Sequence, residues 1–441
     1  MAEAYVGAGK IKMKKVIQLL KNNAPHMRRA GSYGLIITAG LLVMRLTAFA
    51  ISVLIARFSG METLGEFTLF ITLFMLASEI PHAFDTAYLK ATGVKDDEEL
   101  RQLYESANIA IKLALSLALG FVLYMSSRFI NEVFDSEVSG QIFLWAVVCG
   151  GLNSIYMILP VQAQRRFEGK RYALLKPVFN VLVLTLMLFG LTLGVNIDIE
   201  YVLRVYLVVG FVLSLWAIKN ALVIGRLLIG RGSEIRAYLA VSMTLLLSVA
   251  LNLIGNRLDV FFLGHYLNFE ELGIYGAALR MSIVISVLTA VMATVMIPKA
   301  AAAAEDPAKF KRYISLGAFY SFVQLVGGLL LLLLLEPLMS LVFGDGYLDA
   351  VMPASILVCQ VLVTSFGLPF QALIQCGERP SQLVYITLAK VIVSAILLFN
   401  LVPQFGVIGA ALAILVTTIL MSFLLVIIAW RARPVEAPLG A

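Results

Sequence analysis

Long apolar runs of about 20 residues or more alternate with short polar segments along the whole chain. A run of this length forms an α-helix that crosses the roughly 30 Å of hydrocarbon in a bilayer. The first six runs cover residues 34–57, 66–89, 107–130, 140–164, 172–194 and 201–225. The next six cover residues 238–264, 272–298, 313–343, 350–376, 382–402 and 406–430. The pattern predicts an all-α polytopic membrane protein with twelve transmembrane helices.

Two short motifs recur at nearly the same distance and divide the chain into two copies. Pro160–Ala163 (PVQA) returns as Pro369–Ala372 (PFQA) after 209 residues, and Leu64–Phe67 (LGEF) returns as Leu272–Tyr275 (LGIY) after 208 residues. Each copy holds an even number of predicted helices, so both copies enter the membrane from the same side. We therefore predict two parallel six-helix lobes around a central cavity. The glycines of the second motif, Gly65 and Gly273, predict tight turns, and either could instead act as a hinge for rocking.

This division predicts five segments. They are a basic cytoplasmic N-terminal segment with an amphipathic helix (1–33), an N-lobe (34–228), a cytoplasmic linker (229–237), a C-lobe (238–430) and a cytoplasmic tail (431–441). In the first segment, Met13, Val16, Ile17 and Leu20 share one helical face and lysines occupy the other. Such a helix is expected to lie on the membrane surface, either as an anchor or as a sensor of anionic lipid.

Lysine and arginine set the expected orientation. Most of them fall in the loops on one side of the predicted bundle, and that side is expected to face the cytoplasm. Both termini are then cytoplasmic. The dispersed basic loops also account for the net charge of +7 without a nucleic-acid partner. With 61% hydrophobic and 14% charged residues, the chain lies far from soluble domains, in which about a quarter of residues are charged.

The sequence offers little for enzyme chemistry. It contains no phosphate-binding Gly-rich loop with Lys and no His-Glu-x-x-His motif, and its three histidines and three cysteines are too scattered for a metal site. We predict no metal and no cofactor. Membrane glycosyltransferases and polymerases typically hold acidic groups in a sizeable outer loop, and every predicted outer loop here is short. A transporter is the favoured class.

Charged residues inside the apolar runs are the strongest functional signal. Arg45 lies about twelve residues from either end of its run, roughly 18 Å from each surface, which is too far for its side chain to reach water. Such a charge costs about 2.5–3.5 kcal/mol on insertion scales. Glu79 lies at a similar depth on the next helix. The two residues either form a structural ion pair or line a substrate path.

Polar residues gather on the first two helices of each copy. In the second copy, Arg257 and Arg280 accompany a stripe of amides and a carboxylate. A cavity bounded by these four helices would satisfy all these groups. The candidate substrate-binding residues are Arg45, Arg257 and Arg280. The candidate polar or ion-coupling residues of the cavity are Ser52, Thr72, Glu79, His82, Asp85, Asn252, Asn256 and Asp259.

Several motifs carry a resemblance to a known family. Residues 55–67 resemble the end of the first helix and the first loop of bacterial polysaccharide flippases, and residues 257–259 with 272–278 resemble their seventh helix and following loop. Residues 343–347 and 406–411 resemble their ninth-to-tenth connection and their last helix. The resemblance covers the whole chain. The wider superfamily of multidrug, oligosaccharidyl-lipid and polysaccharide exporters also contains lipid II flippases and multidrug antiporters.

The resemblance implies that an undecaprenyl-diphosphate-linked oligosaccharide is flipped from the cytoplasmic to the outer leaflet of the bacterial cytoplasmic membrane for surface polysaccharide biosynthesis. The head group would enter the cavity while the lobes alternate between inward-open and outward-open states. Arginine's planar fork suits diphosphate oxygens. Membrane lipids are implied partners, as are membrane glycosyltransferases and a polymerase of the same pathway.

Three alternatives stay open. A cation-coupled multidrug antiporter could use Glu79, His82 and Asp85 for ion coupling, although Arg45 would repel a cationic substrate. A lipid II flippase would handle similar chemistry, but such flippases usually carry two additional C-terminal helices. A purely structural membrane protein predicts that Arg45→Ala leaves function intact.

Overall fold

The computed structural model describes residues 2–92, 98–134, 139–221, 232–305, 307–376 and 382–431, and every regular element in these ranges is helical. The first half contains α1 (Ala2–Glu79), α2 (His82–Thr92), α3 (Glu98–Met125), α4 (Ser127–Val133), α5 (Ser139–Tyr156), α6 (Ile158–Arg165), α7 (Gly169–Leu175), α8 (Val178–Thr192) and α9 (Ile199–Ala221). The second half contains α10 (Gly232–Gly255), α11 (Leu258–Tyr266), α12 (Phe269–Glu305), α13 (Pro307–Leu333), α14 (Leu335–Val342), the 3-10 helix η1 (Asp345–Ala350), α15 (Val351–Cys376) and α16 (Gln382–Arg431). The predicted all-α architecture is confirmed.

Nine helical segments among the described residues are long and apolar enough to cross a membrane. Two of them, 36–89 and 382–431, have 54 and 50 residues, far more than the roughly 20 that one crossing needs. Each contains a glycine with a left-handed backbone, Gly60 at φ 85° and Gly406 at φ 54°, a conformation that glycine adopts at low cost. If each of these two long segments crosses the membrane twice and α10 crosses it once, the nine segments and α10 together provide twelve crossings. The number twelve itself stays a prediction.

The break at Gly60 folds α1 back on itself. Residues 44–52 before the break and 67–79 after it line one pocket, which a straight helix of this length could not allow. The turn therefore lies at Gly60, while Gly65 and Gly273 lie inside α1 and α12. The prediction of tight turns at these two glycines was wrong.

Gly65 and Gly273 instead mark the place where the two halves touch. A Cβ atom on Gly65 would lie 1.8 Å from the carbonyl oxygen of Phe269, and one on Gly273 would lie 2.0 Å from the carbonyl oxygen of Met61. Residues 61 and 269 are related by the same 208-residue offset as the two glycines. The two halves therefore meet through matching surfaces around a local two-fold axis, with helix backbones in direct contact.

Arg57 adds a second contact between the halves close to this point. Its Nε donates to the carbonyl oxygen of Val342 at 2.9 Å, and its Nη2 donates to the carbonyl oxygens of Ser340, at 3.1 Å, and of Leu341. These carbonyls lie in the last turn of α14, where helical N–H partners run out; the Ser340 carbonyl also accepts from the Gly344 N–H at 3.0 Å. We call the Gly65–Gly273 contact and the Arg57 hydrogen bonds together the glycine seal.

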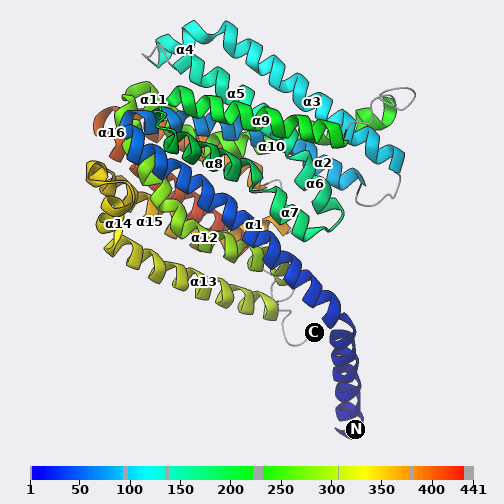
Figure 1. The fold of residues 1–441 in the computed structure, drawn as a ribbon. Coiled ribbons are helices and arrows are strands. Elements are labelled where there is room, and N and C mark those ends of the chain that lie inside the picture. The colour runs from blue at the N-terminus through cyan, green and yellow to red at the C-terminus, as the bar shows by residue number, and fades with distance from the viewer. Residues whose placement is uncertain are drawn as a thin grey trace.

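The helices surround α1 on both sides. In Figure 1, α3, α4, α5 and α9 lie along one side of the molecule and α12 to α15 along the other, with α1 running between them. α1 packs on α5 and on α12. A buried aromatic cluster of Phe70, Phe74, Phe179 and Tyr206, with neighbouring ring centroids 5.0 to 5.9 Å apart, fixes α1 against α8 and α9. This packing positions the pocket-lining face of α1.

Parts of the predicted segments lie outside the described residues. The tail at 432–441 and the first three residues of the linker at 229–237 belong to these parts. α1 begins at Ala2, but the side chains of residues 1–33 are not described, so the amphipathic face stays a prediction. The lobe boundaries at 34–228 and 238–430 also stay a prediction.

Candidate substrate pocket

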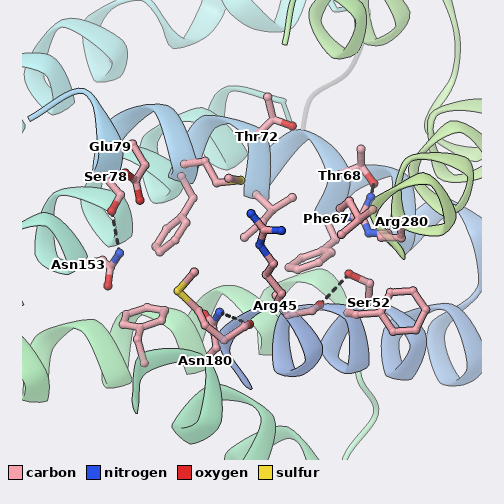
Figure 2. Close-up of a pocket in the computed structure, with 18 of the residues that line it drawn as sticks. Arg45, Ser52, Phe67, Thr68, Thr72, Ser78, Glu79, Asn153, Asn180 and Arg280 are labelled. Carbon is pink, nitrogen blue, oxygen red and sulfur yellow. Dashed lines mark hydrogen bonds between the residues drawn. The ribbon is translucent and has the colours of Figure 1, made fainter. Parts of the chain in front are cut away.

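A pocket of about 400 Å³ lies between the two limbs of α1, with walls from α5, α8, α9 and α12. Most lining residues come from the first half of the chain, and the second half contributes Arg257 and one face of α12 (Figure 2). Six of the predicted site residues line it. They are Arg45, Ser52, Thr72, Glu79, Arg257 and Arg280.

Arg45 lies in the middle of the pocket. In Figure 2 its side chain extends into the space between the group at Glu79 and Asn153 and the group at Thr68 and Arg280. Its guanidinium forms no hydrogen bond and no ion pair with any residue that the structure describes. The structural Arg45–Glu79 ion pair, one of the two readings of the sequence, is therefore not formed, although both residues line the same pocket.

The other two arginines differ in their surroundings. Arg280 is buried, donates to Thr68 Oγ1 at 3.1 Å and to the carbonyl oxygen of Gly276 at 2.8 Å, and lies 5.7 Å from the ring centre of Phe67. It joins α12 to α1 across the two halves. Arg257 has a weak contact of 4.0 Å to the sulfur of Met75. Arg45 and Arg257 thus present guanidinium donors to the pocket. Arg280 uses some of its N–H donors for hydrogen bonds within the protein.

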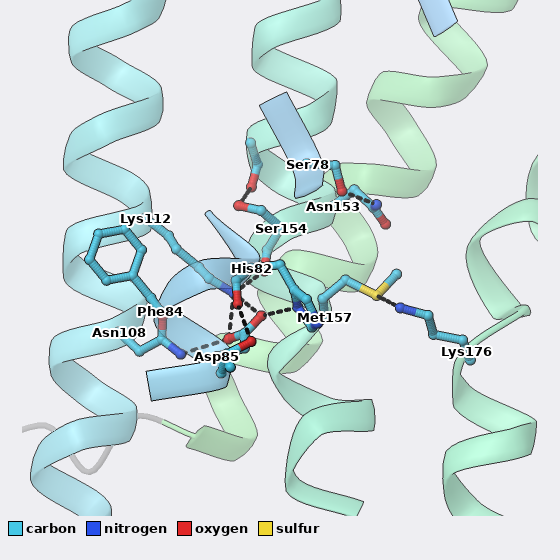
Figure 3. A network of polar contacts seen from close by, with 12 residues as sticks. Ser78, His82, Phe84, Asp85, Asn108, Lys112, Asn153, Ser154, Met157 and Lys176 are labelled. Carbon is cyan, nitrogen blue, oxygen red and sulfur yellow. Dashed lines mark hydrogen bonds and ion pairs between the residues drawn. The ribbon is translucent and has the colours of Figure 1, made fainter. Parts of the chain in front are cut away.

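The remaining predicted residues of the first half lie outside this pocket. Asp85 is fully buried between α2, α3 and α5, where Lys112 Nζ approaches its two carboxylate oxygens at 2.7 and 2.8 Å (Figure 3). Asn108 and His82 bind the same carboxylate at 2.7 and 2.8 Å, and Lys112 also donates to the carbonyl oxygen of Ser154. These groups occupy the carboxylate oxygens of Asp85 between the packed helices. Asp85 is therefore not available to a ligand in the pocket.

Three predicted residues of the second half also lie outside the pocket. Asp259 is buried and accepts hydrogen bonds from the Tyr275 hydroxyl at 2.5 Å and from the backbone N–H of Val260 at 2.9 Å. Asn256 donates to Asn252 at 3.0 Å and accepts a hydrogen bond from Lys390. These groups pair with one another within the second half, so they do not reach the pocket.

The pocket residues that sequence reasoning missed include Asn153, Lys176 and Asn180. Asn153 donates from Nδ2 to Ser78 Oγ at 2.7 Å, and Asn180 donates to the carbonyl oxygen of Met44 at 3.1 Å. Each asparagine is an isolated amide in an apolar run, and that isolation is the signal that could have found it. Lys176 lies near the start of the predicted run 172–194 and was counted with the basic residues of the predicted cytoplasmic side. Among the described residues, no group of three or more His, Cys, Asp or Glu side chains is placed to hold a metal ion.

An all-helical membrane protein with a charged pocket lined from both halves has the architecture of a transporter. Comparison with known folds agrees. The chain is similar to the structure titled "Lipid II flippase MurJ, inward closed conformation", with a TM-score of 0.73, 15% identity, and coverage of 89% of this chain and 87% of that one. It is also similar to an inward-facing multidrug resistance MATE family transporter of the MOP superfamily, with a TM-score of 0.72, 14% identity, and coverage of 90% and 98%.

Relatives of this fold have been captured in more than one conformation. A MATE family transporter in an outward-facing conformation matches with a TM-score of 0.63, 15% identity, and coverage of 90% of this chain and 94% of that one. A MOP superfamily transporter from Pyrococcus furiosus, described as having a binding pocket of reverse polarity, matches with the same TM-score, identity and two coverages. Inward-facing and outward-facing states of one fold are the basis of alternating access.

The sequence itself places the chain in a family. The model of the polysaccharide biosynthesis protein family matches residues 94–352, more than half of the chain, and the chain belongs to this family. Comparison with curated proteins gives no significant match. Family and fold together make this a multi-pass membrane transporter of the flippase type rather than an enzyme.

Proposed function

We propose that this protein flips an undecaprenyl-diphosphate-linked oligosaccharide from the cytoplasmic to the outer leaflet of the bacterial cytoplasmic membrane, for surface polysaccharide biosynthesis. The observation that carries the proposal is the pair of arginines, Arg45 and Arg257, that line one pocket and form no ion pair with a described carboxylate, although the buried Asp259 is close enough to attract Arg257. Unpaired charges at membrane depth are costly. A ligand with phosphate oxygens would compensate them by charge-assisted hydrogen bonds.

The lining charge favours an anionic ligand. Three arginines and Lys176 face the pocket against the single carboxylate of Glu79. Arg45 and Arg257 would bind the diphosphate, and Arg280 would hold the end of the pocket where it already bonds Thr68. Ser52 and Thr72 would offer hydroxyl groups to the same ligand. The lipid tail would stay in the bilayer while the head group crosses within the protein.

The membrane potential can drive this direction of transport. Moving negative charge out of an inside-negative cell is downhill by about 2.3 kcal/mol per charge per 100 mV. A diphosphate with two charges would gain roughly 5 kcal/mol per 100 mV by the same relation. Transport then needs no ion site in the pocket. Membrane glycosyltransferases that supply the substrate and a polymerase that consumes it are the expected partners.

One observation favours a second candidate. Glu79 lines the pocket without an ion pair among the described residues, and a cation-coupled multidrug antiporter would need such a carboxylate. The surplus of cationic side chains argues against a cationic substrate. A lipid II flippase shares the diphosphate chemistry, so only the identity of the glycan separates it from the main proposal.

The test compares cells that lack the gene with cells complemented by wild type, Arg45→Ala, Arg45→Lys or the control Arg171→Ala. Arg171 is exposed and pairs with Glu168 on the surface at 3.1 Å. At equal membrane abundance, we expect wild type and the control to restore surface polysaccharide, Arg45→Ala to fail, and Arg45→Lys to restore it in part because the charge remains but the fork is lost. Unchanged polysaccharide with increased drug sensitivity would favour the antiporter, and defective cell-wall synthesis would favour lipid II.

A further inference from the structure

One end of the pocket has a different chemistry from the arginine region. In Figure 2, Glu79, Ser78 and Asn153 lie together on one side of Arg45, and Thr68, Ser52 and Arg280 lie on the other. Lys176 also lines the pocket, and Figure 3 shows it beyond Met157, whose sulfur lies 3.5 Å from Lys176 Nζ. We call Asn153, Glu79 and Lys176 the amide end of the pocket.

Asn153 has an unmet hydrogen-bonding group. Its side chain is 6% exposed, and its Nδ2 is held by Ser78 Oγ at 2.7 Å. Its Oδ1 is buried and has no hydrogen-bond partner in the structure. An unpaired buried acceptor costs about 1–3 kcal/mol. The residue lines the pocket, so a rotation of its amide group would bring this acceptor to a ligand there and remove the cost.

The chemistry of the amide end selects the part of the ligand that binds there. Asn153 Oδ1 and the Glu79 carboxylate are acceptors, so they need donors from the ligand. An ionised diphosphate has acceptors alone and cannot satisfy them. A sugar has both, since its hydroxyl groups donate to the two acceptors and its oxygens accept from Lys176.

The walls beside the amide end also suit a sugar. Phe74 and Phe179 line the pocket with ring centroids 5.5 Å apart. Both rings are mostly buried against each other and Tyr206, so only a small part of each reaches the pocket, where it offers an apolar surface to the C–H groups of a sugar. A cationic ligand could also satisfy Glu79, but it would meet Arg45 and Lys176 in the same pocket.

We infer that the amide end is the subsite for the sugar attached to the diphosphate, with Asn153 as its specificity-determining residue. The inference rests on the proposed function, because it takes the arginine region as the diphosphate site. It adds that the protein recognises the glycan itself. The head group would therefore bind in a fixed direction, with diphosphate at Arg45 and sugar at Asn153.

Binding to purified protein in lipid nanodiscs tests this inference. The probes are polyprenyl diphosphate without sugar, the same lipid with N-acetylglucosamine and the same lipid with glucose. The variants are Asn153→Ala and Glu79→Gln, with Asn400→Ala as the control. Asn400 is an exposed asparagine of α16 whose Nδ2 bonds the Ile396 carbonyl of its own helix. A thermal unfolding curve for each variant checks the fold.

We expect wild type and Asn400→Ala to bind at least one sugar-bearing probe more tightly than the sugar-free probe. Asn153→Ala should lower this preference by about twofold to tenfold, the effect of one hydrogen bond, and leave the sugar-free affinity unchanged. Equal loss on all probes, or no sugar preference in wild type, would overturn the inference. Arg45→Ala should weaken all probes together, and if it does not, the diphosphate proposal fails instead.

Discussion

Replacing Gly65 with alanine should open the glycine seal. The added Cβ atom would lie 1.8 Å from the Phe269 carbonyl oxygen, whereas ordinary contact begins at 3.4 Å, so the two backbones must separate by about 1.6 Å (3.4 minus 1.8). Neither partner is a flexible side chain that could turn away. The strain therefore acts on the packing of α1 against α12 itself.

The size of the effect follows from this geometry. Inserting a methyl group into a tight contact costs about 1–3 kcal/mol. The higher helix propensity of alanine, worth roughly 1 kcal/mol, applies to every state in which α1 is helical and cancels between them. The ratio of open to closed seals should therefore rise by roughly fivefold to more than a hundredfold.

Cysteine labelling measures this ratio in intact cells. The three native cysteines, Cys149, Cys359 and Cys376, are replaced, and Ile71→Cys places one thiol in the pocket. A membrane-impermeant maleimide added outside should label this thiol faster in Gly65→Ala than in the parent, because the seal is on the predicted outer side. Gly120→Ala is the matched control, since a Cβ there meets no described atom within 4 Å. Equal labelling rates in Gly65→Ala and Gly120→Ala would refute the reasoning.

Three further predictions concern single charges. Lys112→Met leaves the buried Asp85 carboxylate without its lysine cation and should cost about 3–5 kcal/mol of stability, measured as a lower unfolding temperature in detergent. The double variant with Asp85→Asn should recover part of this stability. A double variant as unstable as Lys112→Met would contradict the prediction. Arg57→Gln removes most donors from the α14 carbonyls and should raise outer labelling of the pocket thiol, in the same direction as Gly65→Ala; unchanged labelling would remove Arg57 from the seal. Arg45→Ala should not lower the unfolding temperature, because its guanidinium bonds no described residue; a drop as large as that of Lys112→Met would identify it as structural.

The sequence predicted the architecture well because length and hydropathy decide which segments cross a membrane. It predicted the two halves from two repeated motifs, but for the glycine of one motif it could not tell a turn from a close helix contact. Both roles require a residue without a side chain. The distinction depends on Phe269 and Met61 from the opposite half, and no local pattern reports such neighbours.

The site was predicted in part for a related reason. Arg45 was identified by its depth in an apolar run, which is a local property. The surroundings of Asp85 depend on Lys112, 27 residues away, and those of Asn256 depend on Lys390, 134 residues away. Helix rotation decides whether such a group faces the pocket or a neighbour. Asn153 was overlooked because a single amide in an apolar helix has no periodic pattern around it.

The contrast between two buried charges supports a ligand in the pocket. Lys112 is fully buried, and it is matched by the two oxygens of Asp85 and the carbonyl of Ser154. The fold is thus able to satisfy a cation at membrane depth when that cation is structural. Arg45 lies in the same half of the chain and has no such partner among the described residues. Since an unmatched charge is costly there and brings no packing benefit, its partner is expected to come from outside the chain, and the partner that neutralises it carries negative charge.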